Sequence, residues 1–503
     1  MWERLSSAAL GQLSERNDSG IKIPSYDRSA LKPGHIHFGF GNFFPAFAAY
    51  KTHQLLQAGD RDAFSYGIVA VNVNRTDRSA QFNPQDGLYS VVEMDRAGKN
   101  NVTVVGSVMK FLFAPNDPEA VYNLIASPDT RIVSMTIMPQ THASYRDANG
   151  NLNLQHPDIQ NDLDQNNVPK TVMGYLLRGL VRRGGLPGFT VMNLDNLAGN
   201  GDLFQMLFRQ FAETCDPALA TLVDEKLRFP NSMVDRIVPK TTPELIKAVA
   251  ERLGVEDAAP VPAEPMPRVS WVFESDKFVN GRPAWDAYGL AYAVDEASPY
   301  ELMKLRLLNG SFFGTCQLAD LKGIAFVHEA ISDPFIQRFA VSLMNLESGP
   351  TLKPVPGVDL EAYKKEVVER LSNSALRDTV KRIVRDGALT NHLNSAREQM
   401  SLGLPIDLRA LSIAAWMRRC RVDFNEAGAP IDFQYPSSDM LRAKAKEGGN
   451  DPKALFGVTQ LFGDMGNYPQ FVEAVGKYLE LLDQPNGVDK AVEAAIRSST
   501  KAN

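Results

Sequence analysis

Residues 35–44 read HIHFGFGNFF, a short apolar segment that runs into two glycines with one residue between them. The segment before the first glycine is typical of a strand, and residues 42–58 predict a helix. A G-x-G turn between a strand and a helix is typical of dinucleotide-binding folds. There Gly39 would permit the tight turn, and Gly41 would let the backbone approach a pyrophosphate. Phe44 stands where a third glycine is expected, so an ordinary strand–helix turn is the alternative interpretation.

The first half of the chain continues this alternation of strands and helices. Further strands are predicted at residues 65–73, 102–106, 131–137, 188–194 and 269–274, and the helices between them include 118–126 and 169–183. Such alternation favours a mainly parallel sheet with helices on both faces. The proline-rich residues 256–268 predict an extended connection.

Beyond about residue 295 the pattern predicts helices alone. They are expected at residues 299–309, 318–329, 333–346, 359–386, 407–418, 452–461 and 468–482. We therefore predict an α/β Rossmann-type N-terminal domain at residues 1–294 and an all-α C-terminal domain at residues 295–503.

The composition excludes some classes of function. The chain has 503 residues, of which 44% are hydrophobic, and a formal net charge of -6. This is typical of globular proteins, and no block of lysine and arginine indicates a nucleic-acid surface. Three widely separated cysteines without a CxxC motif fit a reducing compartment, and the scattered histidines predict no metal site. Neither a signal-peptide pattern nor an apolar run of membrane-spanning length is found. We therefore expect a cytoplasmic protein with neither a nucleic-acid nor a membrane partner.

The residues after the second predicted strand bear on the cofactor. Residues 71–79 read VNVNRTDRS, and in a dinucleotide fold an acidic residue at this place binds the adenosine ribose. Asp77 favours the free ribose of NAD, whereas Arg75 suits the 2′-phosphate of NADP. A solvated polar loop is a third interpretation, and the expected cofactor is NAD or NADP. The predicted cofactor contacts are Gly39, Phe40, Gly41, Asn42, Phe43, Asn74, Arg75 and Asp77.

A lysine stands inside the apolar stretch YELMKLRLLNGSFF at residues 300–313. On an α-helix Glu301 and Lys304 would share a face, and Asn309 would lie about 140° further round than Lys304. The apolar positions run nearly all round, which predicts a buried helix. Because burial disfavours the charged form of a lysine, Lys304 is a candidate general base. The alternative is a surface lysine paired with Glu301.

Asn196 lies in NLDNLAGNG, residues 193–201, at the carboxyl end of a predicted strand. Ligands of open α/β sheets bind beyond those ends, and an asparagine there could donate an N–H to a developing alkoxide. A turn asparagine is the alternative, since the glycine-rich sequence that follows also predicts a turn.

Several segments, in this order, resemble the mannitol dehydrogenase family, the polyol-specific long-chain dehydrogenases and reductases. They are HFGFGNF (37–43), VMNLDNLAGNG (191–201), FPNSMVDRIVP (229–239), FESDKFVNGRPAW (273–285), PYELMKLRLLNGS (299–311) and LKPVPGVDL (352–360). The pattern K-x4-N-G in the fifth segment is the family's most specific mark. The resemblance extends over nearly the whole chain.

The resemblance implies a Rossmann-type domain followed by a helical domain, with the site in the cleft between them. It also implies metal-independent hydride transfer between a secondary alcohol and a nicotinamide. The matching positions are Lys304 as the general base, Asn196 and Asn309 as hydrogen-bond donors to the reacting oxygen, and Glu301 as a carboxylate that helps exchange the proton with solvent.

The substrate-facing positions depart from the family's pattern. The family's F-x-R-A-H after the glycine turn is FFPAF at residues 43–47, and Phe312 stands where the family has a histidine. Pro139 replaces a glutamate, and a lysine-bearing segment becomes RDGALTNHLNS at residues 385–395. Since a site that loses its polar groups binds hydroxyls less well, our hypothesis is a substrate other than plain mannitol, with an apolar or bulky part.

Other residues could contact this substrate. Asp235 and Arg236 fall in the VDRI segment and are expected to shape the cleft. Asn391, His392 or His142 could supply replacement polar contacts, and the alternative for each is a solvated loop residue. The predicted substrate contacts are Asp235, Arg236, Phe312 and His392.

Three functions compete at this point. The first is an NAD(P)-dependent oxidoreductase, similar to mannitol 2-dehydrogenase, that interconverts a secondary alcohol of a sugar alcohol or sugar derivative and the ketone. The second is a ketose or sugar-acid reductase of the same family, similar to fructuronate reductase. The third is a catalytically silent binding protein, against which Lys304, Asn196 and Asn309 argue. We expect a small sugar alcohol or ketose as the ligand, and the chain could work as a monomer.

Overall fold

The computed structural model describes residues 2–15, 18, 20–73, 76–137, 141, 144–147, 149–386 and 389–502. The chain divides into two compact units, Met1–Glu301 and Leu302–Asn503, and each is described by itself. The sequence predicted a domain boundary between residues 294 and 295, a few residues before the division between Glu301 and Leu302. This boundary stays a prediction.

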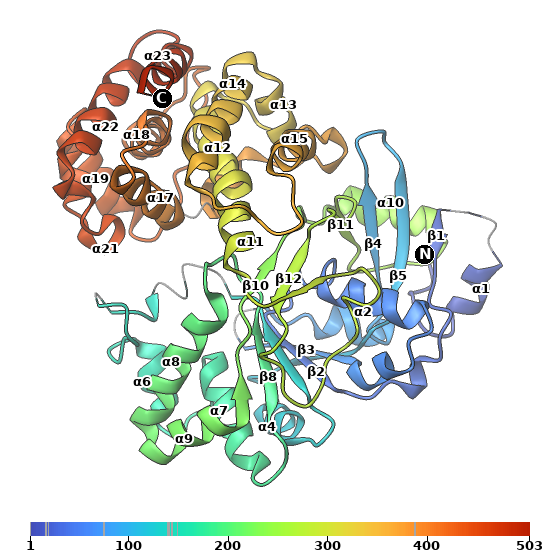
Figure 1. The fold of residues 1–503 in the computed structure, drawn as a ribbon. Coiled ribbons are helices and arrows are strands. Elements are labelled where there is room, and N and C mark those ends of the chain that lie inside the picture. The colour runs from blue at the N-terminus through green and yellow to red at the C-terminus, as the bar shows by residue number, and fades with distance from the viewer. Residues whose placement is uncertain are drawn as a thin grey trace. The chain divides into compact units, whose positions relative to one another are not determined.

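A six-stranded parallel sheet forms the framework of the first unit (Figure 1). In spatial order its strands are β6 (Val108–Phe113), β3 (Ile68–Asn72), β2 (His35–Phe38), β7 (Ile132–Met135), β8 (Phe189–Asn193) and β9 (Leu227–Arg228). Every neighbouring pair is parallel. Of the strands of this sheet, β2 comes first along the chain, but it lies inside the sheet, so the direction of winding reverses beside it, as in dinucleotide-binding folds. The predicted Rossmann-type α/β class is confirmed.

Successive side chains of the strands enter two different apolar cores, because they point to opposite faces of the sheet. Val69 and Val71 of β3 pack in one core, and Ile68 and Ala70 pack in the other. The helices of the first core include α4 (Pro118–Ala126), α7 (Val172–Arg183), α8 (Asn200–Cys215) and α9 (Pro217–Lys226). Helix α2 (Ala48–Gln57) belongs to the second core. The sheet is therefore covered on both faces, as predicted.

Smaller elements complete the first unit. One further sheet has the order β1 (Ile21–Lys22), β5 (Asn100–Val105), β4 (Tyr89–Met94) and β11 (Val261–Ala263), and another has β10 (Ser232–Val234), β12 (Trp271–Glu274) and β13 (Tyr292–Val294). The remaining helices are α1 (Leu10–Ser14), α3 (Ser79–Phe82), α6 (Pro157–Leu163) and α10 (Pro243–Leu253), with 3-10 turns at Arg28–Ala30, Asp62–Tyr66 and Asn83–Gln85.

The strand predicted at residues 102–106 does not join the parallel sheet. As β5 it pairs antiparallel with β4. Only a short turn at residues 95–99 connects these strands, and a parallel partner would need a long crossover. Residues 256–268, which we predicted to be a connection, contribute β11 to the same sheet.

The regular elements of the second unit, within its described residues, are helical. They are the end of α11 (Ser298–Met303), a π-helix (Lys304–Asn309), α12 (Gly310–Lys322), α13 (Val327–Ser332), α14 (Pro334–Ser342), a second π-helix (Leu343–Ser348), α15 (Leu360–Leu371), α16 (Val380–Asp386), α17 (Leu389–Ser401), α18 (Asp407–Arg421), α19 (Ser438–Gly448), α20 (Lys453–Phe456), α21 (Thr459–Phe462), α22 (Pro469–Leu482) and α23 (Gly487–Ala502), with 3-10 turns at Gly349–Thr351, Ser374–Leu376 and Met465–Asn467. Helix α18 is buried along most of its length and packs against α12, α19, α22 and α23. The predicted all-α class is confirmed.

Three predicted helices are interrupted. One of them, residues 452–461, forms α20 and α21, with Gly457 and Val458 between them. Residues 359–386 form two helices, because Arg377 adopts a left-handed conformation with a φ of 47° that an α-helix cannot contain. Residues 318–329 are divided at Gly323, whose φ is 82°. The helices predicted from hydrophobic periodicity ran across these breaks.

Two further observations concern membrane-spanning helices and cysteines. In the part that the structure describes, no helix is both long and apolar enough to cross a membrane. Cys215, Cys316 and Cys420 are free thiols.

Gly39→Ala should lower the free energy of unfolding by roughly 1–3 kcal/mol, since it forces a strained backbone. A Cβ at residue 39 would lie 2.1 Å from the Thr136 carbonyl oxygen, and Gly39 has a φ of 88°. Chemical denaturation measures the change. Gly41→Ala is the matched control, because a Cβ there meets no atom within 4 Å. Its stability should stay within about 0.5 kcal/mol of wild type. Equal losses in the two variants would contradict the steric argument.

Candidate active site

The carboxyl ends of β2, β3, β7 and β8 lie along one edge of the parallel sheet, because parallel neighbours share a direction. This edge carries the glycine turn after β2, the loop after β3 and the loop after β8 that contains Asn196. Ligands of open α/β sheets bind outside this edge, where the winding reverses. The edge is therefore the candidate cofactor site.

The two glycines of the turn after β2 have different surroundings. Thr136 Oγ1 donates to the Gly39 carbonyl (2.7 Å), and the backbone of Thr136 leaves no room for a side chain at residue 39. A Cβ at Gly41 would instead point into open space, so a ligand can approach the backbone there. This arrangement fits a pyrophosphate group, which binds to backbone N–H groups in such turns.

Two side chains tie the glycine turn to the end of β3. Asn72 Oδ1 accepts the Phe40 N–H (2.7 Å), and its Nδ2 donates to the Thr76 carbonyl (2.9 Å). Arg78 Nη1 donates to the carbonyls of Phe40 and Gly41 (3.3 and 3.0 Å). Arg78 was not among the predicted contacts, although it lies in VNVNRTDRS, the segment that supplies the predicted contacts Asn74, Arg75 and Asp77.

Asp77 is exposed in this loop. Its carboxylate accepts the Ser79 N–H (2.8 Å), and the hydrogen bonds from Ser79 hold the pKa of Asp77 below its usual value. Asp77 is therefore charged at neutral pH, which suits a free ribose and disfavours a 2′-phosphate. Asn74 and Arg75 lie outside the described residues, so their contribution stays a prediction.

Three predicted cofactor contacts remain. The Phe40 side chain is fully buried, so only its backbone belongs to the surface of the turn. Asn42 Nδ2 donates to Thr241 Oγ1 (3.3 Å). Phe43 stacks on Phe47 with ring centroids 4.8 Å apart, and Phe47, which stands where the family has a histidine, is fully buried. Contacts of Phe40, Asn42 and Phe43 with a cofactor stay predictions.

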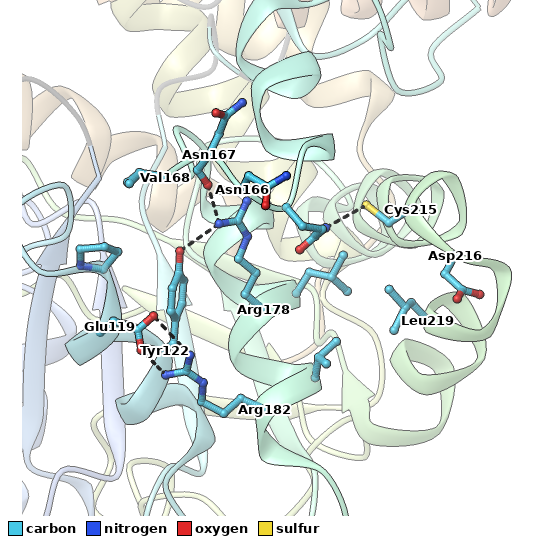
Figure 2. A pocket seen from close by; sticks show the side chains of 14 residues that line it. Glu119, Tyr122, Asn166, Asn167, Val168, Arg178, Arg182, Cys215, Asp216 and Leu219 are labelled. Atoms are coloured by element: carbon cyan, nitrogen blue, oxygen red, sulfur yellow. Dashed lines mark hydrogen bonds and ion pairs between the residues drawn. The ribbon is translucent and has the colours of Figure 1, made fainter.

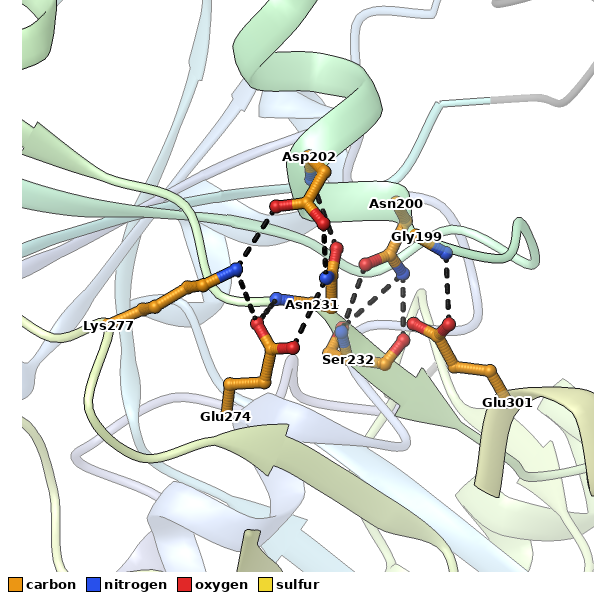
Figure 3. A network of polar contacts seen from close by, with 8 residues as sticks. All are labelled: Gly199, Asn200, Asp202, Asn231, Ser232, Glu274, Lys277 and Glu301. Carbon is orange, nitrogen blue, oxygen red and sulfur yellow. Dashed lines mark hydrogen bonds and ion pairs between the residues drawn. The ribbon is translucent and has the colours of Figure 1, made fainter. Parts of the chain in front are cut away.

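Asn196 is exposed at the tip of a tight turn after β8. In this turn the Leu197 N–H donates to the carbonyl of Asp195, which is itself buried (2.9 Å). The loop ends at Gly199, whose N–H donates to Glu301 Oε2 (2.9 Å; Figure 3). The structure thus brings Glu301 to the loop of Asn196 within the first unit.

The proton affinity of Glu301 is unusual for a carboxyl group. Burial raises its pKa to about 7, despite the opposing hydrogen bond from the Gly199 N–H. The carboxylates Glu274 and Asp202 raise it further, and the Lys277 ammonium lowers it. A carboxyl group that titrates near neutral pH can take up and release a proton. Proton exchange by Glu301 stays a prediction, which this pKa supports.

Lys304 and Asn309 begin and end one π-helix in the second unit. The Gly310 N–H that closes it bonds to the Leu305 carbonyl, five residues earlier. Residues five apart in a π-helix lie about one turn apart, so both side chains project from the same side. The α-helical geometry that we assumed, with an offset of about 140°, is wrong because the π-helix holds more residues per turn. Lys304 is only 5% exposed, which also excludes a lysine at the surface.

The predicted substrate contacts of the second unit differ in burial. Phe312 is partly buried on α12, whereas His392 lies in α17 with its ring against Phe313 at 4.7 Å. Nδ1 of His392 accepts from Arg409 Nη1 (3.2 Å), which leaves the proton on Nε2. Burial, with the Arg409 cation, holds the pKa of His392 well below its usual value. The solvated-loop interpretation is therefore wrong for His392, and His142 lies outside the described residues.

Arg236 is engaged within the first unit. Its guanidinium donates to the Glu264 carbonyl (2.9 and 2.7 Å) and to the Ala46 carbonyl, and it pairs with Glu93 (2.6 Å). Asp235 is also buried. These contacts give Arg236 a structural role, and a contribution of either residue to the substrate cleft stays a prediction.

A separate hollow of about 790 Å³ lies among α4, α7 and the junction of α8 with α9 (Figure 2). Arg178 donates to the Tyr122 hydroxyl (3.2 Å) and to the Asn167 carbonyl, and Arg182 pairs with Glu119 (2.8 Å). Protein groups therefore already bind both arginines. None of the predicted site residues lines this hollow, so we do not assign it to the candidate site.

Comparisons with known proteins cover both halves of the chain. Residues 33–287 match the mannitol dehydrogenase Rossmann domain, and residues 296–483 match the mannitol dehydrogenase C-terminal domain. The chain is 36% identical over 481 residues to a mannitol 2-dehydrogenase of Pyricularia oryzae, with 92% of each chain covered. It is also 36% identical over 492 residues to a mannitol dehydrogenase of Saccharomyces cerevisiae, with 95% of each chain covered.

Solved structures agree with these matches. A Pseudomonas fluorescens mannitol 2-dehydrogenase in a ternary complex with NAD and D-mannitol is 32% identical, with a TM-score of 0.90 over 98% of this chain and 99% of that chain. A D-sorbitol dehydrogenase in substrate-free form is 30% identical, with a TM-score of 0.78 over 97% of this chain and 100% of that chain. The domain matches and these relatives together show that the chain belongs to the mannitol dehydrogenase family.

Proposed function

We propose that the protein is an NAD-dependent oxidoreductase that interconverts a secondary alcohol of a sugar alcohol and the corresponding ketone. The observation that carries this proposal is the π-helix that places buried Lys304 and partly buried Asn309 about one turn apart. Burying a lysine is costly, and the proposed role of Lys304 as general base gives a reason for that cost. The relatives named mannitol 2-dehydrogenase support the same class of reaction.

The glycine turn and the loop after β3 would hold the dinucleotide. Gly39 shapes the turn, and the open backbone at Gly41 would receive the pyrophosphate. The charge of Asp77 favours the free ribose of NAD, the cofactor in the similar P. fluorescens structure. A nicotinamide dinucleotide bound there would accept a hydride in alcohol oxidation and supply one in ketone reduction.

The residues of the chain would handle the proton and the charge on oxygen. Deprotonated Lys304 would take the hydroxyl proton of the alcohol, and in the reductive direction it would return that proton. The amides of Asn196 and Asn309 would donate to the oxygen as it becomes alkoxide-like. Glu301, with a pKa of about 7, would exchange the proton with solvent.

The substrate would be less polar than a plain hexitol at one position. Phe312 supplies no hydrogen-bond donor where the family has a histidine, so a hydroxyl group facing it would lose its partner. His392 Nε2 has no hydrogen-bond partner among the described residues, which makes it a candidate replacement donor. Phe312 therefore supports a substrate that is a sugar derivative with an apolar or bulky group.

We also propose the cytoplasm as the location of the protein. Its free cysteines fit a reducing compartment. A monomer is the proposed working state.

Lys304→Ala should lower kcat by roughly 10²–10⁴-fold, because it removes the general base. The affinity for NADH should stay within about twofold, since the expected cofactor contacts come from other residues. Steady-state kinetics with the best substrate of a polyol and ketose screen measures the loss. Lys353→Ala, which removes an exposed lysine of the same unit, is the control and should keep the wild-type rate. A wild-type rate in Lys304→Ala would refute the proposal that Lys304 is the general base.

NADH should quench the tryptophan fluorescence saturably and bind more tightly than NADPH, because the charge of Asp77 repels a 2′-phosphate. Trp271 and Trp285 are buried in the core of the first unit and supply the fluorescence there. Asp77→Asn, which keeps an acceptor for Ser79, should reduce the difference between the affinities for NADH and NADPH. Tighter binding of NADPH would refute the argument from Asp77. Binding of neither dinucleotide by the folded protein would refute the oxidoreductase proposal.

Phe312→His should raise kcat/KM for D-mannitol by roughly tenfold or more, since it restores a donor for a substrate hydroxyl. Steady-state rates with D-mannitol measure the gain. Phe312→Leu is the control, because it changes the size of the side chain without adding a donor. Equal rates in the two variants would show that Phe312 does not set the substrate.

A further inference from the structure

The exposed tip of the Asn196 loop needs support from buried groups. An amide that donates to a reacting oxygen must be placed accurately, because a displacement of about 1 Å can cost 10²-fold in rate. The loop is short and lies between two ordered elements, β8 and α8. What holds its backbone therefore decides where Asn196 points.

Asn200 holds the start of the loop. It is fully buried at the beginning of α8, and its Nδ2 donates to the Asp195 carbonyl (3.0 Å), directly before Asn196. The same amide pairs with the backbone of Ser232 in β10. Nδ2 donates to the Ser232 carbonyl (2.8 Å), and Oδ1 accepts the Ser232 N–H (3.0 Å). Asn200 thus fastens the loop to a strand outside it.

Glu301 holds the end of the loop. Its Oε2 accepts the Gly199 N–H (2.9 Å), and Gly199 adopts a φ of 62° at the N-cap of α8. Oε1 is buried and has no hydrogen-bond partner among the described residues. One oxygen of Glu301 can therefore carry the proton while the other accepts the hydrogen bond from Gly199. With a proton on Oε1, Oε2 still accepts a hydrogen bond, so the contact with Gly199 persists in both protonation states.

A second network makes the support rigid (Figure 3). Asn231 Oδ1 accepts the Asp202 N–H (3.0 Å), and Asn231 Nδ2 donates to the Asp202 carboxylate (2.8 Å). Glu274 accepts from the backbone N–H and from Nδ2 of Asn231 (2.9 and 3.2 Å). Lys277 bridges Glu274 and Asp202 (2.9 and 3.0 Å). The start of α8 is therefore fixed to Asn231, directly before β10, and to Glu274 at the end of β12.

We propose that Asn200 and Glu301 are positioning residues for Asn196, which hold its loop by the Asp195 carbonyl and the Gly199 N–H. The inference rests on the proposed function, in which Asn196 donates to the reacting oxygen. It gives Glu301 a task besides proton exchange, and it gives Asn200 a role in the reaction. Both residues act through Asn196.

Hydrogen exchange of the loop amides tests the two contacts directly. In Asn200→Ala and Glu301→Leu, peptides that cover residues 194–203 should exchange roughly tenfold faster than in wild type, because local opening becomes easier. Glu301→Gln should exchange like wild type, since its side-chain carbonyl can still accept the Gly199 N–H. Unchanged exchange in both Asn200→Ala and Glu301→Leu would overturn the proposal.

Asn83→Ala is a matched control for Asn200→Ala. Asn83 makes the same paired hydrogen bonds with the backbone of Phe111 (2.9 and 3.0 Å), in a different part of the unit. It should leave the exchange of residues 194–203 unchanged. Faster exchange there in Asn83→Ala would reveal a general loss of stability and would count against a local role for Asn200.

The turnover number separates positioning from proton exchange. Both Glu301 variants lose the exchangeable proton, but only Glu301→Leu loses the acceptor, so its kcat should be lower than that of Glu301→Gln by roughly tenfold. Asn200→Ala should lower kcat by a similar factor, roughly tenfold, without changing KM or NADH affinity to the same extent. Equal kcat values for the two Glu301 variants would overturn the positioning role of Glu301, even where Asn200→Ala fails to fold.

A double-mutant cycle shows whether the effect passes through Asn196. In an Asn196→Ala background, Asn200→Ala should cost no further kcat, and the difference between the two Glu301 variants should vanish. Fully additive losses would overturn the proposal. A wild-type kcat in Asn196→Ala alone would instead refute the role of Asn196 in the proposed function, and the hydrogen exchange would still decide whether the contacts hold the loop.

Discussion

The parallel pairing of β2 with β3 on one side and with β7 on the other is the constraint on which the first unit depends. Because these strands run in register, their carboxyl ends lie level, and the residues that follow them can bond to one another. Thr136 then binds the Gly39 carbonyl, and Asn72 binds the Phe40 N–H. The glycine turn is therefore shaped by its neighbours on both sides and not by its own sequence alone.

Burial of polar side chains explains why two of the motifs occur together. Asn200 of NLDNLAGNG bonds to the backbone of Ser232 in FPNSMVDRIVP, and Asn231 of the second motif bonds to Asp202, just beyond the first. A buried amide left without a partner costs about 1–3 kcal/mol. Each motif thus satisfies the polar groups of the other, and together they carry the exposed Asn196.

The second unit fixes a neutral histidine in a similar way. Glu347 is fully buried and accepts the N–H groups of Leu408 and Arg409 at the start of α18 (Glu347 Oε2 to Arg409 N, 2.9 Å). Burial raises the pKa of Glu347 to about 7. The Arg409 guanidinium in turn donates to Nδ1 of His392. The tautomer of His392 therefore depends on residues that lie far from it in the sequence.

The sequence by itself determined the α/β class of the first half, the helical class of the second and the family. Hydrophobic period, glycine placement and the spacing of Lys304 and Asn309 are local properties that a single chain displays. Only the tertiary structure decided that β5 leaves the parallel sheet, that residues 304–309 form a π-helix, and that Glu301 binds Gly199. The physical reason is that burial and hydrogen-bond partners come from residues distant along the chain, as Gly199 and Glu301 are, 102 positions apart.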